Sequence, residues 1–137
     1  MSARTKARKR ALDLLYAADI RQVPVAQLLA VEAERAAKEP ERMASWLYAR
    51  EIVDGVIDHH EEIDEQIESH AHGWTIARMP TIDRALLRIG VWELLFNDDI
   101  PDPVAISEAV DAATQLSTDE SAGFVNGLLA AIAQARH

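Results

Sequence analysis

Cationic side chains crowd the first ten residues of the chain, where they could bind phosphate groups. This segment holds no acidic residue and carries +5, from Arg4, Lys6, Arg8, Lys9 and Arg10. Because the whole chain carries −9, the remaining 127 residues sum to −14. An acidic body does not attract polyanions, but a concentrated basic arm can bind phosphates locally. Charge alone therefore leaves two interpretations open, a nucleic-acid contact and a solvated N-terminus.

The five histidines are the obvious candidates for a metal site. His59 and His60 are adjacent, and His70 and His72 are two apart, so neither pair shares one face of a helix. The run from His60 to Asp64 resembles a metalloprotease helix except at its last position, where Asp stands in place of the second histidine. We interpret the histidines as solvated and predict no metal.

Motifs for catalysis are also missing from the sequence. It contains no cysteine, no glycine-rich phosphate loop and no Gly-x-Ser-x-Gly. We therefore predict a protein that is not an enzyme and needs no cofactor. The lack of cysteine suits a reducing compartment, and no stretch reads as a signal peptide or membrane span, so we expect a cytoplasmic protein.

Two aromatic residues could supplement the basic cluster, because single-stranded RNA stacks its bases on aromatic rings beside a cationic track. Tyr16 follows the cluster in sequence. Phe124 follows Ser117-Thr118-Asp119-Glu120, which has the Ser-x-x-Glu form of a helix-capping box. The start of that helix would also offer unpaired backbone N–H groups to phosphates. On the residues alone, core packing is the simpler interpretation of Phe124 and base stacking is the alternative.

Apolar residues recur at helical spacing along the whole chain. Together with caps and prolines they predict seven helices: about 4–20, from Pro24 to before Pro40, about 41–57, an acidic helix after His59-His60, 80–96, from Pro103 onward, and from Ser117 to near the C-terminus. Asp102 is placed to cap the sixth helix. No strand-like alternation is present. The sequence predicts an all-α protein with one domain over residues 1–137.

The segment 80–96 is predicted to be the buried central helix of this bundle. It is apolar around most of its circumference, which is typical of a buried helix. It is interrupted by Asp83, Arg84, Arg88 and Glu93, and it is too short to span a membrane. Gly90 costs about 1 kcal/mol relative to alanine in a helix interior. We therefore expect a neighbouring helix to approach closely at Gly90.

The same spacing predicts which side chains face the core. On the 41–57 helix these are Met43, Trp46, Leu47, Val53, Val56 and Ile57. On the helix from Pro103 they are Val104, Ile106, Ala109, Val110, Ala113 and Leu116. The acidic fourth helix is expected to bury only Ile63, Ile67 and Ala71.

Residues 79–129 contain five recognisable motifs, which are Ile82–Arg88, Glu93–Leu95, Asp99–Pro101, Val104–Val110 and Phe124–Leu129. Together with the basic first helix over Arg8–Tyr16, they resemble the NusB family of transcription antitermination factors. Residues 22–72 match only in helical character. Ser107 stands where Asn is usual, and Lys9 and Asp13 replace Glu and Gln. We expect none of these three to abolish RNA binding, and they leave the RNA preference open.

The resemblance implies a helical domain that binds a single-stranded boxA-type RNA element of ribosomal RNA leaders. It implies the small ribosomal protein NusE as a partner, within an antitermination complex on RNA polymerase. By position, the basic cluster becomes the phosphate-binding face, and Thr118 to Ser121 with Phe124 becomes the surface that meets bases. Tyr16 and Asp83 would touch the protein partner, with Arg84 beside them. Some family members form homodimers that hide the RNA face, and the sequence leaves this open.

Two hypotheses follow for the function. The first is an RNA-binding adaptor in which the basic helix supplies electrostatics and the Phe124 region supplies sequence preference. The second is an acidic helical scaffold that binds a basic protein and does not bind RNA directly. On the second view, removing residues 1–10 would leave partner binding intact.

Overall fold

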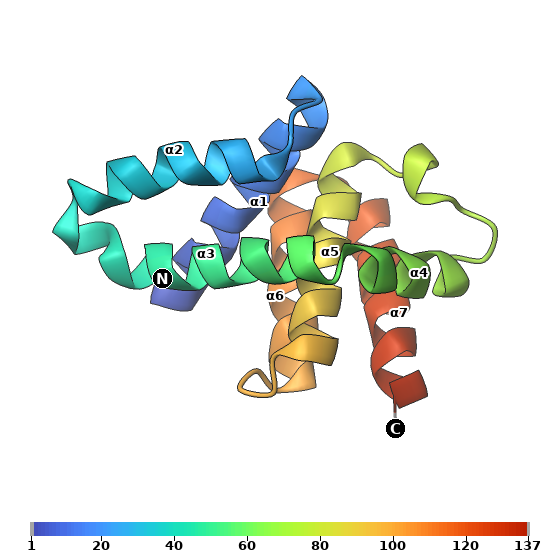
Figure 1. Ribbon diagram of the computed structural model, residues 1–137. Coiled ribbons are helices and arrows are strands. Elements are labelled where there is room, and N and C mark those ends of the chain that lie inside the picture. The colour runs from blue at the N-terminus through green and yellow to red at the C-terminus, as the bar shows by residue number, and fades with distance from the viewer. Residues whose placement is uncertain (1, 137) are drawn as a thin grey trace. The chain divides into compact units, whose positions relative to one another are not determined.

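The computed structural model describes residues 2–136. Over these residues the chain forms seven α-helices, two short 3-10 helices and no strand, which confirms the all-α prediction. The helices are α1 (Ala3–Arg21), α2 (Val25–Ala37), α3 (Met43–Asp58), α4 (His60–His70), α5 (Thr81–Phe96), α6 (Asp102–Leu116) and α7 (Asp119–Arg136), with η1 (Pro40–Arg42) before α3 and η2 (Ile76–Arg78) before α5 (Figure 1).

The chain divides into two compact units, and the boundary falls inside α3. The N-terminal unit is Met1–Asp54 and the C-terminal unit is Gly55–His137. That the two units together make up one domain stays a prediction.

In the N-terminal unit, α1 packs against α2. Ser2 begins α1 as its cap, because the Ser2 hydroxyl oxygen accepts a hydrogen bond from the Thr5 backbone N–H at 3.1 Å. The apolar stripe predicted for this helix is buried, and consists of Ala7, Ala11, Leu14, Leu15 and Ala18. Gln22 ends the helix in the left-handed conformation, with φ of 56°.

In the C-terminal unit, α5 packs against α4, α6 and α7, and α5 to α7 run side by side (Figure 1). Its side chains are buried over most of the helix, which confirms that segment 80–96 is central. The close approach expected at Gly90 comes from α7, because a Cβ there would lie 2.8 Å from a methyl carbon of Leu129. Gly55 makes a closer approach, since its Cβ would lie 1.9 Å from the indole nitrogen of Trp92.

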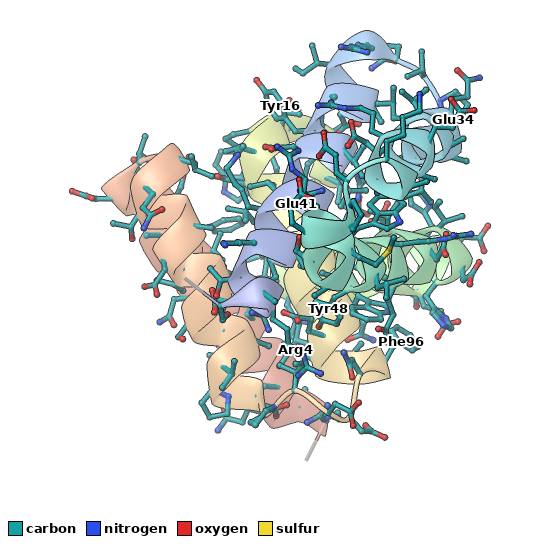
Figure 2. All side chains as sticks on the ribbon, turned by 90° about the vertical axis from the view of Figure 1, so that its left-hand side faces the viewer. Arg4, Tyr16, Glu34, Glu41, Tyr48 and Phe96 are labelled. Carbon is teal, nitrogen blue, oxygen red and sulfur yellow. The ribbon has the colours of Figure 1, made fainter. Side chains whose placement is uncertain are left out.

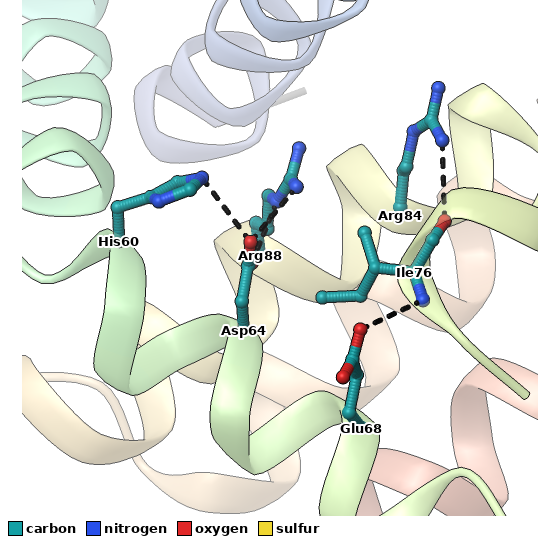
Figure 3. A network of polar contacts seen from close by, with 6 residues as sticks. All are labelled: His60, Asp64, Glu68, Ile76, Arg84 and Arg88. Carbon is teal, nitrogen blue, oxygen red and sulfur yellow. Dashed lines mark hydrogen bonds and ion pairs between the residues drawn. The ribbon is translucent and has the colours of Figure 1, made fainter. Parts of the chain in front are cut away.

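Polar contacts connect α4 and η2 to α5 (Figure 3). Arg88 donates two hydrogen bonds to the Asp64 carboxylate, at 2.9 and 3.1 Å, and the His60 ring nitrogen lies 3.2 Å from the same carboxylate. The backbone of Ile76 is held at both polar atoms. Its N–H donates to Glu68 at 3.2 Å, and its carbonyl accepts from Arg84 at 3.2 Å. These contacts fix the segment that leads into α5.

Two predicted helix caps are wrong in detail. Asp102 lies inside the first turn of α6, where its carboxylate accepts hydrogen bonds from Arg136 at 2.7 Å instead of capping the helix. The α7 cap is Thr118 and not Ser117, because the Thr118 hydroxyl oxygen accepts from the Ser121 N–H at 3.0 Å. The Ser117 hydroxyl instead donates to Asp83 at 3.0 Å. In both cases the side chain that is predicted to cap the helix instead forms a hydrogen bond with a residue distant in sequence.

Several large apolar residues predicted to face the core are exposed. They are Met43, Leu47 and Ile57 on α3, and Val104 and Leu116 on α6. The buried residues of α6 are small, namely Ala105, Ala109 and Ala113, whereas α3 buries Trp46, Tyr48, Ala49, Ile52, Val53 and Val56. Small side chains allow helices to approach closely and leave the larger ones at the flanks. The acidic helix α4 buries Ile63 and Ile67, followed by Ala71, as predicted.

Candidate nucleic-acid interface

The two units differ sharply in charge. Residues 1–54 contain ten Lys and Arg and eight Asp and Glu, for a net charge of +2, whereas residues 55–137 contain four and fifteen, for a net charge of −11. The positive contribution to any phosphate contact therefore comes mainly from the N-terminal unit. An isolated cation in the C-terminal unit stands out against its acidic surroundings.

The basic cluster on α1 is organised partly by Tyr48 of α3. The guanidinium carbon of Arg4 lies 5.1 Å from the centre of the Tyr48 ring (Figure 2). That of Arg8 lies 5.8 Å from the same centre. Cations at this distance are attracted by the ring quadrupole. Arg8 is buried and Arg4 is exposed. Arg4 is thus available to a ligand, while Arg8 also has a packing role.

The other three cations of the cluster, Lys6, Lys9 and Arg10, do not contact Tyr48 in the same way and have different surroundings. Residues two apart on a helix differ in direction by about 200°, so Arg8 and Arg10 cannot share a face. Arg10 lines a hollow of about 480 Å³ together with Arg21, Arg35 and Arg42. Lys9 pairs with Asp13 at 2.6 Å, and Lys6 is exposed. The predicted phosphate-binding residues therefore occupy more than one side of α1.

The turn before α7 is built on the buried carboxylate of Asp83 from α5. Asp83 is 2% exposed and accepts hydrogen bonds from the Ser117 hydroxyl at 3.0 Å and the Ser121 hydroxyl at 2.8 Å. The Ser117 and Ser121 oxygens lie 3.0 Å apart. Asp83 thus fixes the turn from Ser117 to Ser121, which the sequence predicts as a base-contacting surface.

This turn borders a hollow of about 420 Å³ in the C-terminal unit. Its lining includes the hydroxyl residues Ser117, Thr118 and Ser121, together with Trp74 and Phe124. The rings of Trp74 and Phe124 have centroids 6.5 Å apart and are tilted by 54°. Phe124 is half-buried, so part of its ring packs against the protein and part is accessible to a ligand. An aromatic ring beside hydroxyl groups is suited to an unstacked nucleobase, because the ring can stack on the base and the hydroxyl groups can hydrogen-bond to its edge.

The predicted partner-binding residues differ in accessibility. The Tyr16 side chain is 39% exposed and can be reached by another protein (Figure 2). Arg84 bonds to the Ile76 carbonyl and to the Thr81 hydroxyl at 3.3 Å. Because the Asp83 carboxylate is buried and occupied by two hydroxyl groups, any effect of Asp83 on a partner acts through the turn that it holds.

Sequence reasoning missed Trp74 as a candidate. It follows His72 and Gly73, which take positive φ values of 50° and 93°, and its side chain is 53% exposed. A large aromatic residue directly after a glycine, outside any helical stripe, is the signal that could have revealed it.

The histidines have separate surroundings. His59 stacks on Phe96 with ring centroids 3.8 Å apart, and a His70 ring nitrogen lies 2.9 Å from the Gln66 carbonyl. Within residues 2–136, no three potential metal-binding side chains come together. Over the same residues, every helix is too short or too polar to cross a membrane.

Comparison with known proteins places these features in a family. The model of the NusB family matches residues 5–134, which is nearly the whole chain. The chain belongs to the NusB family. It is 80% identical over 134 residues to the transcription antitermination protein NusB of Leifsonia xyli subsp. xyli, an alignment that covers 98% of this chain and 93% of that protein.

Solved NusB structures have the same fold. One is T. maritima NusB, with a TM-score of 0.85, 30% identity, and coverage of 96% of this chain and 90% of that one. Another contains the antitermination factors NusB and NusE in complex with double-stranded RNA, with a TM-score of 0.82, 33% identity, and 98% of each chain covered.

Proposed function

We propose that this NusB-family chain is an RNA-binding adaptor for transcription antitermination. Its ligand would be a single-stranded boxA-type element of ribosomal RNA leaders, bound together with NusE. The observation that carries the proposal is the hollow beside the Asp83-held turn, where Phe124 and hydroxyl groups can meet a base. The exposed cations of α1 supply phosphate contacts. A structural relative that forms a complex with NusE and double-stranded RNA supports NusE and RNA as ligands.

The charge distribution supports the protein partner. A C-terminal unit with a net charge of −11 suits a basic ribosomal protein, because opposite charges speed encounter and disfavour wrong partners. We propose that the adaptor joins the antitermination complex on RNA polymerase in the cytoplasm and acts by binding, without catalysis. A homodimer that hides the RNA-binding residues is a further proposal, which sedimentation at several protein concentrations tests.

We expect RNA binding to weaken steeply with salt. If about four phosphates are contacted, the slope of log K against log salt should be near −3, since each contact to a single strand contributes roughly −0.7. Replacing Arg4 and Lys6 by alanine should make the slope less steep by about 0.7 for each of the two that contacts a phosphate, and should weaken all RNAs equally. Fluorescence anisotropy at several salt concentrations, with single-stranded and double-stranded RNA of the same sequence, measures this.

Arg4 and Lys6 are chosen because both are exposed, whereas Ala7 and Arg8 are buried and truncation of α1 would disturb packing. Lys38→Ala is the matched control, since it removes an exposed cation outside the cluster. A salt slope that is flat, or that changes equally in the Lys38→Ala control, would contradict the electrostatic role of the cluster.

Phe124→Ala should narrow the difference in affinity between a boxA-type RNA and a scrambled one. For the boxA-type RNA, loss of the base stacked on Phe124 should cost roughly 1–3 kcal/mol of binding free energy. Paired titrations with the two RNAs measure the difference, and the melting temperature is measured alongside. If the variant mainly lowers the melting temperature and keeps the discrimination, Phe124 is a core residue and its assignment to RNA is wrong.

The acidic scaffold is the second candidate, favoured by the high negative charge of the C-terminal unit. It predicts that the Arg4→Ala and Lys6→Ala double variant binds NusE as tightly as the parent protein while neither protein binds RNA. RNA binding by the parent protein alone would exclude this candidate.

A further inference from the structure

We propose that Trp74 and Arg78 form a second nucleotide-binding position beside Phe124. In this position Trp74 stacks on one base, and Arg78 binds an adjoining phosphate. The ligand class is single-stranded RNA, so the inference rests on the proposed function. It extends that function to residues that neither the basic cluster nor the α7 turn includes.

Trp74 is the tryptophan that a ligand can reach. Its side chain is 53% exposed, whereas Trp46 and Trp92 are 4% and 5% exposed. A half-exposed indole leaves a large apolar surface in water, and tryptophan offers a broad π-face on which any base can stack. The two positive φ values before it reverse the chain, so Trp74 lies outside the helices that bury the other two tryptophans.

Trp74 lines two hollows. The first is the 420 Å³ hollow that contains Phe124 and the α7 turn, and the second is a shallower hollow of about 290 Å³ that contains His72, Gly73 and Arg78. A single base clamped between two aromatic rings needs the rings to be nearly parallel. The 54° tilt between Trp74 and Phe124 does not provide this. The two rings are therefore arranged for separate bases, which corresponds to a strand continuing from one hollow into the next.

Arg78 supplies the cation that the second hollow needs. The other arginines of the C-terminal unit are engaged: Arg84 bonds to the Ile76 carbonyl, Arg88 pairs with Asp64, and Arg136 pairs with Asp102. Arg78 is exposed, and within residues 55–136 it is the arginine whose side chain has no ion pair or hydrogen bond. A guanidinium group with its donors unused, next to an exposed indole, matches the phosphate and base of one nucleotide.

Because Trp74 is exposed and the other two tryptophans are buried, tryptophan fluorescence can report on a base that stacks on Trp74. Intrinsic tryptophan fluorescence is recorded while a short single-stranded boxA-type RNA is added, and binding is followed in parallel by the anisotropy of a dye on the RNA. We expect the RNA to quench the emission of the parent protein, because a stacked base quenches the exposed indole. In Trp74→Phe, which keeps an aromatic ring, we expect the quenching to disappear while most of the affinity remains.

Trp74→Leu should weaken binding by roughly five- to hundredfold, the equivalent of one lost base stack. Arg78→Ala should make the salt slope less steep by about 0.7. An RNA series with one abasic nucleotide at each position locates the stacked base. At that position the abasic RNA should bind the parent protein and Trp74→Leu equally weakly. Arg50→Ala, which removes an exposed arginine of the other unit, is the control for general charge loss.

The outcomes separate the two proposals. If anisotropy shows binding but the tryptophan emission is unchanged, or if it is quenched equally in Trp74→Phe, the second nucleotide position is wrong and the proposed function stands. Unchanged affinity in Trp74→Leu would overturn it in the same way. If no RNA binds under any condition, both proposals fail.

Discussion

Replacing Asp83 with alanine should lower the free energy of unfolding by about 2–4 kcal/mol. Two hydroxyl groups donate to this buried carboxylate, and a hydrogen bond to a charged group contributes roughly 1.5–3 kcal/mol. In the variant the Ser117 hydroxyl no longer donates to Asp83 and can donate to the Ser121 oxygen, 3.0 Å away, which recovers part of the loss. Chemical denaturation of the parent and variant proteins measures the difference.

A double-mutant cycle shows whether the loss of stability comes from the hydrogen bond between Ser121 and Asp83 or from general packing. Ser121→Ala and Asp83→Ala are made singly and together, and the coupling energy should be about 0.5–3 kcal/mol, as for residues in one network. Asp83→Asn is the conservative comparison, because the amide keeps one oxygen acceptor of the same size. A change of less than 0.5 kcal/mol in Asp83→Ala would show that the carboxylate does not hold the turn.

Asp83→Ala also has a functional consequence under the proposed function. Since the turn that it holds borders the Phe124 hollow, loosening the turn should reduce discrimination between boxA-type and scrambled RNA. The salt slope should stay unchanged, because no cation is removed. Titration with both RNAs at two salt concentrations, below the melting temperature of the variant, separates these effects.

Gly55→Ala should destabilise the protein by about 1–3 kcal/mol, the usual cost of overpacking. The added methyl group would overlap the Trp92 ring, with contacts of 1.9, 2.4 and 2.6 Å to three ring atoms. An indole ring is rigid, so α3 or Trp92 must move. Thermal and chemical denaturation measure the loss.

Gly127→Ala is the matched control for Gly55→Ala. Gly127 also lies inside a helix, but a Cβ there meets no atom within 4 Å. Alanine should therefore stabilise α7 by about 0.5–1 kcal/mol. If both substitutions stabilise the protein, helix propensity and not the contact with Trp92 decides the effect at Gly55.

The helices could be predicted from the sequence because their signals are local. Apolar spacing located α5 within a residue, since 80–96 is the predicted segment and the helix is Thr81–Phe96. The caps could not be predicted in full, because Asp102 and Ser117 are engaged by Arg136 and Asp83, which are distant in sequence. That Leu47 is exposed while Ala49 is buried likewise depends on tertiary packing, which apolar spacing alone does not specify.

The candidate site was predicted in part for the same reason. The basic residues and Phe124 were recognisable by type and by family resemblance. That Arg8 is buried near Tyr48 while Arg10 lines a different hollow depends on the packing of α2 and α3 against α1. Trp74 was missed because it lies outside every periodic stripe, and only the tertiary structure places it beside Phe124.

The anchoring of Ile76 at both its N–H and its carbonyl has a kinetic consequence. The two bonds hold the backbone two residues after Trp74 before any RNA arrives. A segment that is already ordered loses little conformational entropy on binding. Since nearly all protein molecules are then in the conformation that binds RNA, the apparent affinity is close to the intrinsic affinity. Association should then proceed in one concentration-dependent phase, limited by encounter, without a slower step for loop rearrangement.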